Sequence, residues 1–143
     1  MQSGDSRADM PRRLDEQDIR RRLEPLFARS DVDLVVLFGS RARGSAVPSS
    51  DVDLGVMARG DIEDLRIEAI RLLETDWVDV VDLSRADPLL AMSVARYGRP
   101  IHERKPGAFA SFASLALRRY NDTAKFRELE ARRLREWLSA RGL

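Results

Sequence analysis

Apolar residues in the first part of the chain recur with the spacing of a helix and then form an unbroken run. Between residues 12 and 30 the apolar side chains fall on one face of a predicted helix: Ile19, Leu23, Leu26 and Phe27. Pro25 interrupts this pattern, so we expect the helix to kink or restart there. Residues 34–38 are apolar throughout, which predicts a strand buried on both faces, and Gly39 ends it.

A second strand is predicted over residues 51–58, and its two faces differ in chemistry. Its apolar side chains alternate onto one face: Val52, Leu54 and Val56. Asp51 and Asp53 share the opposite face, because side chains two positions apart in a strand point the same way. Aspartate is disfavoured in strands, and two aspartates on one face repel each other unless a cation lies between them. This pair therefore needs an explanation that a solvated loop aspartate does not need.

A helix and a third strand follow. Residues 61–75 form a predicted helix that begins near Asp61, and its inward positions are Ile62, Leu65, Ala69, Ile70, Leu72 and Leu73. Residues 78–83 form the third predicted strand, which carries Asp79 and Asp82.

The last elements are marked by their boundaries. The aspartate–proline pair at residues 87–88 predicts the start of a helix, and Gly98 predicts its end through a left-handed cap. Residues 99–103 form a predicted edge strand. Residues 106–141 are mainly helical in pattern, with a break predicted near residues 121–122.

This order of elements predicts an α+β protein with a small mixed β-sheet flanked by helices and a helical C-terminus. Residues 1–11 are polar and have no apolar signal core, so we expect them to be a disordered leader. Residues 12–143 then form one domain, in which residues 106–143 are a helical C-terminal extension.

Composition narrows the classes of protein to which this chain can belong. Of the 143 residues, 43% are apolar, which predicts a globular chain, and no apolar run reaches the length of a membrane span. Cysteine is absent, which excludes disulfides and thiolate metal sites and agrees with a reducing cytoplasm. The net charge is only +1, so direct nucleic-acid binding is not expected.

The strongest chemical signal is the spacing between two short motifs. Gly39 and Ser40 follow the first strand, and the ten residues 41–50 separate them from Asp51, with Asp53 two positions further on. Each half alone is common in proteins, and the specificity lies in their combination. A glycine allows phosphate to approach the backbone, a serine hydroxyl donates to phosphate oxygens, and paired carboxylates bind magnesium. The spacing is therefore typical of nucleotidyl transfer.

Residues 35–56 resemble the minimal nucleotidyltransferase family of the DNA polymerase β superfamily, whose pattern is Gly-Ser, ten residues, then Asp-x-Asp. The likeness extends through residues 78–83 and more loosely to the C-terminus. It implies a polymerase β-like nucleotidyltransferase fold and a reaction that uses ATP and magnesium, with two ions expected.

The resemblance also implies roles for individual residues. Asp51 and Asp53 are the expected magnesium ligands and catalytic carboxylates. Gly39 and Ser40 are expected to bind the nucleotide phosphates. Arg41 and Arg43 are candidate contacts to the triphosphate, and an equal alternative is that they are solvent-facing loop residues.

The family also has a third carboxylate on a neighbouring strand, where it binds the metal and assists removal of the acceptor proton. Asp79 and Asp82 are the candidates, and on a regular strand only one of them can face the site. Spacing does not decide between them. The resemblance places the third carboxylate, and so a third metal ligand, at Asp79, and it leaves Asp82 as a strand-end residue.

Chains of this family and length are often antitoxins of a type VII-like toxin–antitoxin system. The resemblance implies a cytoplasmic protein adenylyltransferase that moves AMP from ATP to a tyrosine of a helical HEPN ribonuclease toxin. Two alternatives stay open: an antitoxin that acts by binding alone, and a small-molecule nucleotidyltransferase of the aminoglycoside-modifying kind.

Three features fall outside this motif. His102, the single histidine, is expected in an exposed strand with a structural role. Trp77 and Trp137 are expected in the core or in an interface. The arginine-rich helix after residue 118 has an apolar stripe, which predicts packing on its own domain; a partner-binding helix is the alternative, and a nucleic-acid groove a weaker one.

Overall fold

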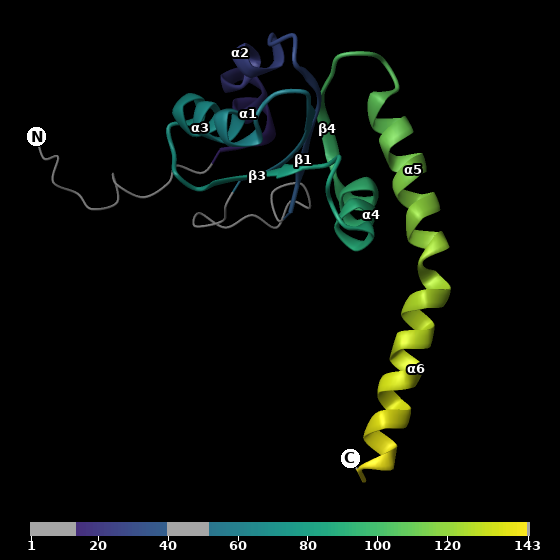
Figure 1. The fold of residues 1–143 in the computed structure, drawn as a ribbon. Coiled ribbons are helices and arrows are strands. Elements are labelled where there is room, and N and C mark those ends of the chain that lie inside the picture. The colour runs from purple at the N-terminus through teal and green to yellow at the C-terminus, as the bar shows by residue number, and fades with distance from the viewer. Residues whose placement is uncertain (1–13, 40–51, 143) are drawn as a thin grey trace, which may run out of the picture.

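The computed structural model describes residues 14–39 and 52–142, and its centre is a four-stranded sheet (Figure 1). The strands are β1 (Val32–Phe38), β2 (Val52–Ala58), β3 (Val78–Asp82) and β4 (Arg99–Glu103). They lie in the order β3-β2-β1-β4, with β1 antiparallel to both β2 and β4 and with β2 parallel to β3. The predicted mixed sheet is confirmed.

Three helices cover one face of the sheet: α1 (Glu16–Arg22), α2 (Glu24–Phe27) and α3 (Ile62–Leu73). The predicted first helix is thus two short helices, with Pro25 in the first turn of α2, where its missing N–H costs no hydrogen bond. The predicted stripe and the apolar face of β2 meet in one core cluster, which includes Ile19, Leu23, Leu26, Val52, Leu54, Val56, Leu65, Ala69 and Leu73. Burial of this apolar area holds the layer together.

Two helices cover the other face: α4 (Pro88–Tyr97) and α5 (Ala108–Asp122). Asp87 caps α4 by accepting a hydrogen bond from the Leu90 N–H at 2.8 Å, as the aspartate–proline pair predicts. A second core cluster lies here, formed by Leu34, Val36, Leu83, Ala91, Val94, Phe112 and Ala116. The central strand β1 is therefore buried on both faces, as its continuous apolar run predicts.

Helix α6 (Ala124–Ala140) continues from α5 and extends beyond the sheet and the other helices (Figure 1). The break between the two helices falls at Thr123, next to the predicted position. No residue of α6 is buried. The expectation that this helix packs on its own domain is wrong for residues 124–140, because its apolar positions reach past the surface that α4 and the sheet offer.

The end of α4 departs from the predicted left-handed glycine cap. Gly98 has φ −73° and ψ 155°, which is extended backbone. A Cβ atom at this position would lie 2.4 Å from the carbonyl oxygen of Val94 and 2.6 Å from Cγ1 of Val36. Glycine is needed here because α4 ends in close contact with β1, and positive φ plays no part.

His102 on β4 is less exposed than its charged neighbours suggest. Its ring stacks on Phe27 with the centroids 4.9 Å apart, and its Nε2 atom is buried without a hydrogen-bond partner. This placement agrees with a structural role.

Trp77 and Trp137 are both largely exposed and lie outside the two core clusters. No helix in residues 14–39 and 52–142 is both long and apolar enough to cross a membrane.

Candidate functional site

Gly39, which follows the last residue of β1, lies against the carboxylate of Asp53 on β2. Its φ of +77° is in the left-handed region that glycine occupies without strain. A Cβ atom on Gly39 would lie 2.2 Å from Oδ2 of Asp53. The preceding residue, Phe38, is the register partner of Asp53 across the antiparallel pair. The turn after β1 and the predicted metal-binding strand are therefore in direct contact.

The pairing of β2 with β3 places Asp79 beside Asp53. Register partners in a parallel pair point to the same face of the sheet, and neighbouring strands lie about 4.8 Å apart. Two carboxylates thus stand side by side at one end of the sheet. Asp53 is partly buried and Asp79 is exposed, so a ligand can reach the pair from solvent.

Asp82 lies apart from this carboxylate pair, on the opposite face of the sheet. Its register partner is Val56, whose side chain belongs to the core on the opposite face of β2 from Asp53. The Asp82 carboxylate accepts hydrogen bonds from the N–H of Ser84 at 3.0 Å and from its hydroxyl at 2.6 Å. Asp82 therefore organises the turn after β3.

Arg66 on α3 is a basic residue near this site that the sequence patterns did not single out. It forms an ion pair with Glu63 at 2.9 Å. That hydrogen-bonded pair raises the pKa of the Arg66 guanidinium, and the negative charges of Asp79 and Asp76 raise it further. The side chain of Arg66 thus lies within the electrostatic reach of Asp79. Its sequence signal is only an i, i+3 pair on a surface helix, which many helices contain.

The carboxylates of Asp53 and Asp79 fit a divalent cation, because their mutual repulsion is relieved by positive charge and because magnesium prefers carboxylate oxygens. Within the described ranges no group of three or more metal-ligating side chains occurs. Four predicted site residues lie outside the residues that the structure describes: Ser40, Arg41, Arg43 and Asp51. Asp53 and Asp79 are thus the two described members of the predicted carboxylate set.

Comparison with known proteins gives a family match over most of the sheet. Residues 21–107, more than half of the chain, match the family described as polymerase beta, nucleotidyltransferase. The matched segment contains Gly39, Asp53 and Asp79 together with all four strands.

A curated relative has the same general size. The chain is 26% identical over 124 residues to the protein adenylyltransferase MntA of Aphanizomenon flos-aquae (strain 2012/KM1/D3), which covers 77% of this chain and 83% of that protein.

Two solved structures with a similar fold are of toxin–antitoxin complexes. A chain in the crystal structure of a toxin–antitoxin with AMP-PNP matches with a TM-score of 0.69 at 25% identity, over 85% of this chain and 98% of that one. A chain from a structure of the tri-AMPylated Shewanella oneidensis HEPN toxin in complex with MNT antitoxin matches with a TM-score of 0.65 at 22% identity, over 82% and 97%. The second likeness, at its lower identity, shows the fold.

Proposed function

This chain belongs to the polymerase beta nucleotidyltransferase family, and on that premise we propose that it is an antitoxin that transfers AMP from ATP to a tyrosine of a HEPN toxin. The observation that carries the transferase part is the register of Asp53 with Asp79 beside the turn at Gly39. These three residues come from three separate segments, and the fold brings them to one end of the sheet.

In this proposal, the turn after β1 binds the phosphates of ATP. Gly39 has no side chain, so phosphate oxygens can approach its backbone. Ser40 donates its hydroxyl to a phosphate oxygen, and Arg41 and Arg43 add charge-assisted hydrogen bonds to the triphosphate.

The carboxylates of Asp51, Asp53 and Asp79 hold magnesium in this proposal. When bound there, magnesium would neutralise charge on the phosphates and make the α-phosphorus more electrophilic. Gly39 contributes by leaving the Asp53 carboxylate room beside the phosphate-binding turn.

The transfer is a displacement at the α-phosphorus. The tyrosine hydroxyl oxygen of the acceptor forms a bond to this phosphorus, and the bond from the phosphorus to the bridging β-phosphate oxygen breaks. Pyrophosphate leaves with that electron pair, and the proton of the hydroxyl passes to the Asp79 carboxylate. Asp79 is exposed, so the hydroxyl of an acceptor can reach its carboxylate from solvent.

The toxin is proposed as the acceptor for two reasons. The relative from Aphanizomenon flos-aquae is a protein adenylyltransferase, and the similar chain at 25% identity comes from a toxin–antitoxin structure that contains an ATP analogue. In addition, helix α6 exposes large apolar side chains along a free-standing helix, namely Phe126, Leu129, Leu134 and Trp137. Exposed apolar surface of this kind is typical of a protein-binding face.

The same helix favours one alternative function. An antitoxin that neutralises its toxin by contact alone would need a docking face and no catalysis, and α6 supplies such a face. The paired carboxylates favour the transferase, because contact alone gives no reason to place Asp53 beside Asp79.

Intact-mass analysis of the cognate HEPN toxin, after incubation with this protein, ATP and magnesium, tests the proposal. We expect the toxin mass to increase by one or more AMP units, and we expect no increase with Asp53→Asn. A stable complex without any mass increase would support inhibition by contact. Absence of both a complex and a mass increase would contradict both functions.

A further inference from the structure

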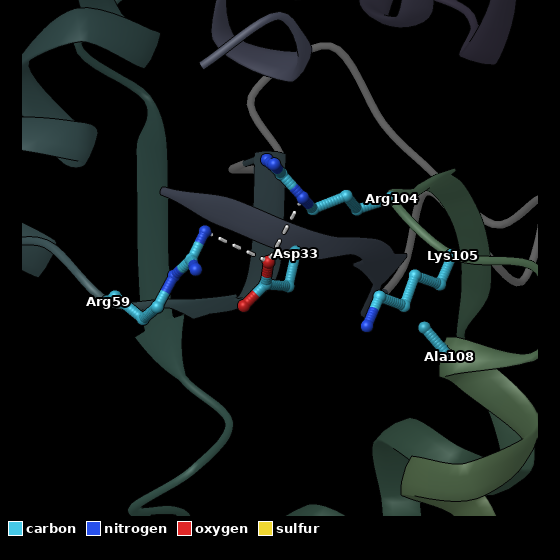
Figure 2. A pocket seen from close by; sticks show the side chains of 5 residues that line it. All are labelled: Asp33, Arg59, Arg104, Lys105 and Ala108. Carbon is cyan, nitrogen blue, oxygen red and sulfur yellow. Dashed lines mark ion pairs between the residues drawn. The ribbon is translucent and has the colours of Figure 1, made fainter. Parts of the chain in front are cut away.

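A basic hollow lies at the end of the sheet opposite to Gly39 and Asp53. Its volume is about 420 Å³, and its lining residues are Asp33, Arg59, Arg104, Lys105 and Ala108 (Figure 2). Asp33 is near the start of β1, and Arg59 follows the end of β2. The β1–β2 pairing runs from Val32 with Ala58 at this end to Phe38 with Asp53 at the other, so the hollow is separate from the carboxylate pair.

Two of the three cations that line the hollow approach its one carboxylate. Arg59 and Arg104 both point toward Asp33, with nitrogen–oxygen distances of 3.4 Å and 3.9 Å to the same Oδ1 atom (Figure 2). Both distances exceed the length of a good charge-assisted hydrogen bond. One carboxylate is therefore shared by two loosely paired guanidinium groups. The positive charge of the two arginines is only partly neutralised.

The two arginines are held in place by the backbone. Each donates a hydrogen bond to the carbonyl oxygen of Ser30, and the Arg104 Nη1 atom lies 2.5 Å from it. A neutral carbonyl orients the guanidinium groups without cancelling their charge. Their remaining N–H groups stay available to an anion, since a guanidinium has five donors.

Lys105 adds a third positive charge. It forms no ion pair or side-chain hydrogen bond with the described residues, and it lies beside Ala108 at the start of α5 (Figure 2). Two neighbouring carboxylates do not line the hollow and have hydrogen-bond partners of their own. Glu103 accepts a hydrogen bond from the Phe109 N–H at 2.8 Å, and Asp31 pairs with Arg29 at 3.0 Å. The lining of the hollow thus keeps an excess of positive charge.

We propose that this hollow binds a small phosphate compound, such as pyrophosphate or another oligophosphate. Guanidinium forks and a lysine ammonium match the oxygens of a phosphate in shape and charge. None of the described residues that line the hollow is aromatic, so they offer no stacking surface for the bases of single-stranded RNA. The ligand is therefore recognised through its phosphates, at a site apart from the one that serves AMP transfer.

Calorimetric titration of the full chain with pyrophosphate tests the site, with EDTA present so that metal-dependent binding at the carboxylates is suppressed. We expect millimolar or tighter binding by the unmodified chain. Arg104→Ala combined with Lys105→Ala should weaken it by about tenfold or more, because two charge-assisted contacts are lost. Arg85→Ala is the matched control, since that arginine is 89% exposed and lies after β3.

Lys105→Ala alone distinguishes an effect on pyrophosphate binding from an effect on folding, because this side chain forms no ion pair or hydrogen bond with the described residues. It should weaken binding by about threefold while the unfolding midpoint stays unchanged. Equal affinity in the unmodified chain and the double variant would overturn the proposal. So would the absence of binding by the unmodified chain at about 10 mM pyrophosphate, since a dissociation constant of about 1 mM already corresponds to only about −4.1 kcal/mol. Preferential binding of a single-stranded RNA that the double variant loses would overturn the assigned ligand class.

Discussion

Gly39 leaves open the space in which the carboxylate of Asp53 lies, since a Cβ atom at Gly39 would stand 2.2 Å from Asp53 Oδ2. Gly39→Ala should therefore displace the carboxylate as well as strain the backbone at φ +77°. We expect AMP transfer to fall by about 100-fold, because a displacement near 1 Å in a catalytic group has an effect of that order. Transfer assays and thermal unfolding measure the two effects.

Gly107→Ala is the control for the backbone effect. Gly107 has φ +90°, and a Cβ atom there would meet nothing within 4 Å. Its substitution should lower the free energy of unfolding by about 1 kcal/mol and leave transfer unchanged. Equal losses of activity in the two variants would show that the contact with Asp53 has no catalytic importance.

Asp79→Asn and Asp82→Asn should have opposite consequences. Asp79 stands beside Asp53, so its substitution should lower AMP transfer by about 100- to 10,000-fold and leave the free energy of unfolding close to that of the unmodified chain. Asp82 instead accepts hydrogen bonds from the N–H and hydroxyl of Ser84, and the neutral amide oxygen of asparagine accepts them more weakly than a carboxylate does. Its substitution should therefore lower that free energy by about 1 kcal/mol and preserve transfer. Urea unfolding and a transfer assay on both variants check this, and the reverse pattern would move the third carboxylate to Asp82.

The apolar face of α6 should affect partner binding and not folding. Leu134 is 58% exposed and Trp137 is 50% exposed. Replacing both with serine should weaken the complex with the toxin by about tenfold or more, because large apolar side chains dominate interface energies. The melting temperature of the free chain should barely change. Arg135→Ser, one position from Leu134 and on a different side of the helix, is the control for binding measured by calorimetry.

If the Leu134→Ser, Trp137→Ser variant binds the toxin as tightly as the unmodified chain does, this face of α6 is not the docking surface. That result would not contradict the proposed transfer reaction. Complete loss of the free chain's cooperative unfolding would instead contradict the exposure of α6 in the structure.

Asp31 should stabilise the fold in a pH-dependent way. The hydrogen bonds from Arg29 lower the pKa of the Asp31 carboxyl, with a further contribution from the charge of that arginine. A lowered pKa in the folded state means that the stabilisation is present above the unfolded-state pKa of about 3.9 and is lost as the pH falls through the folded-state pKa.

At pH 7 Asp31→Asn should lower the free energy of unfolding by at most about 1 kcal/mol, since the pair is partly exposed and solvent screens it. The difference from the unmodified chain should shrink below about pH 4. Urea unfolding at several pH values measures it. Asp76→Asn, at an exposed aspartate without an ion pair to the described residues, is the control, and a difference for Asp31→Asn that is constant with pH would contradict the electrostatic origin.

Sequence alone determined the features that depend on neighbours along the chain. The apolar run of β1, the alternation of β2 and the cap of α4 at Asp87 were all predictable, because strand and helix periods and capping hydrogen bonds are local. The Gly-Ser and Asp-x-Asp spacing predicted the family for the same reason, since both motifs lie within a stretch of fifteen residues at positions 39–53.

Tertiary structure decided what depends on partners far apart in sequence. Strand alternation left Asp79 and Asp82 equivalent, and only the parallel register of β3 against β2 places Asp79 beside Asp53. The close approach of Gly98 to Val36, which leaves no room for a Cβ atom, joins segments some sixty residues apart. The apolar stripe of α6 has the same period whether the helix is buried or free, so the period could not reveal that this helix stands clear of the domain.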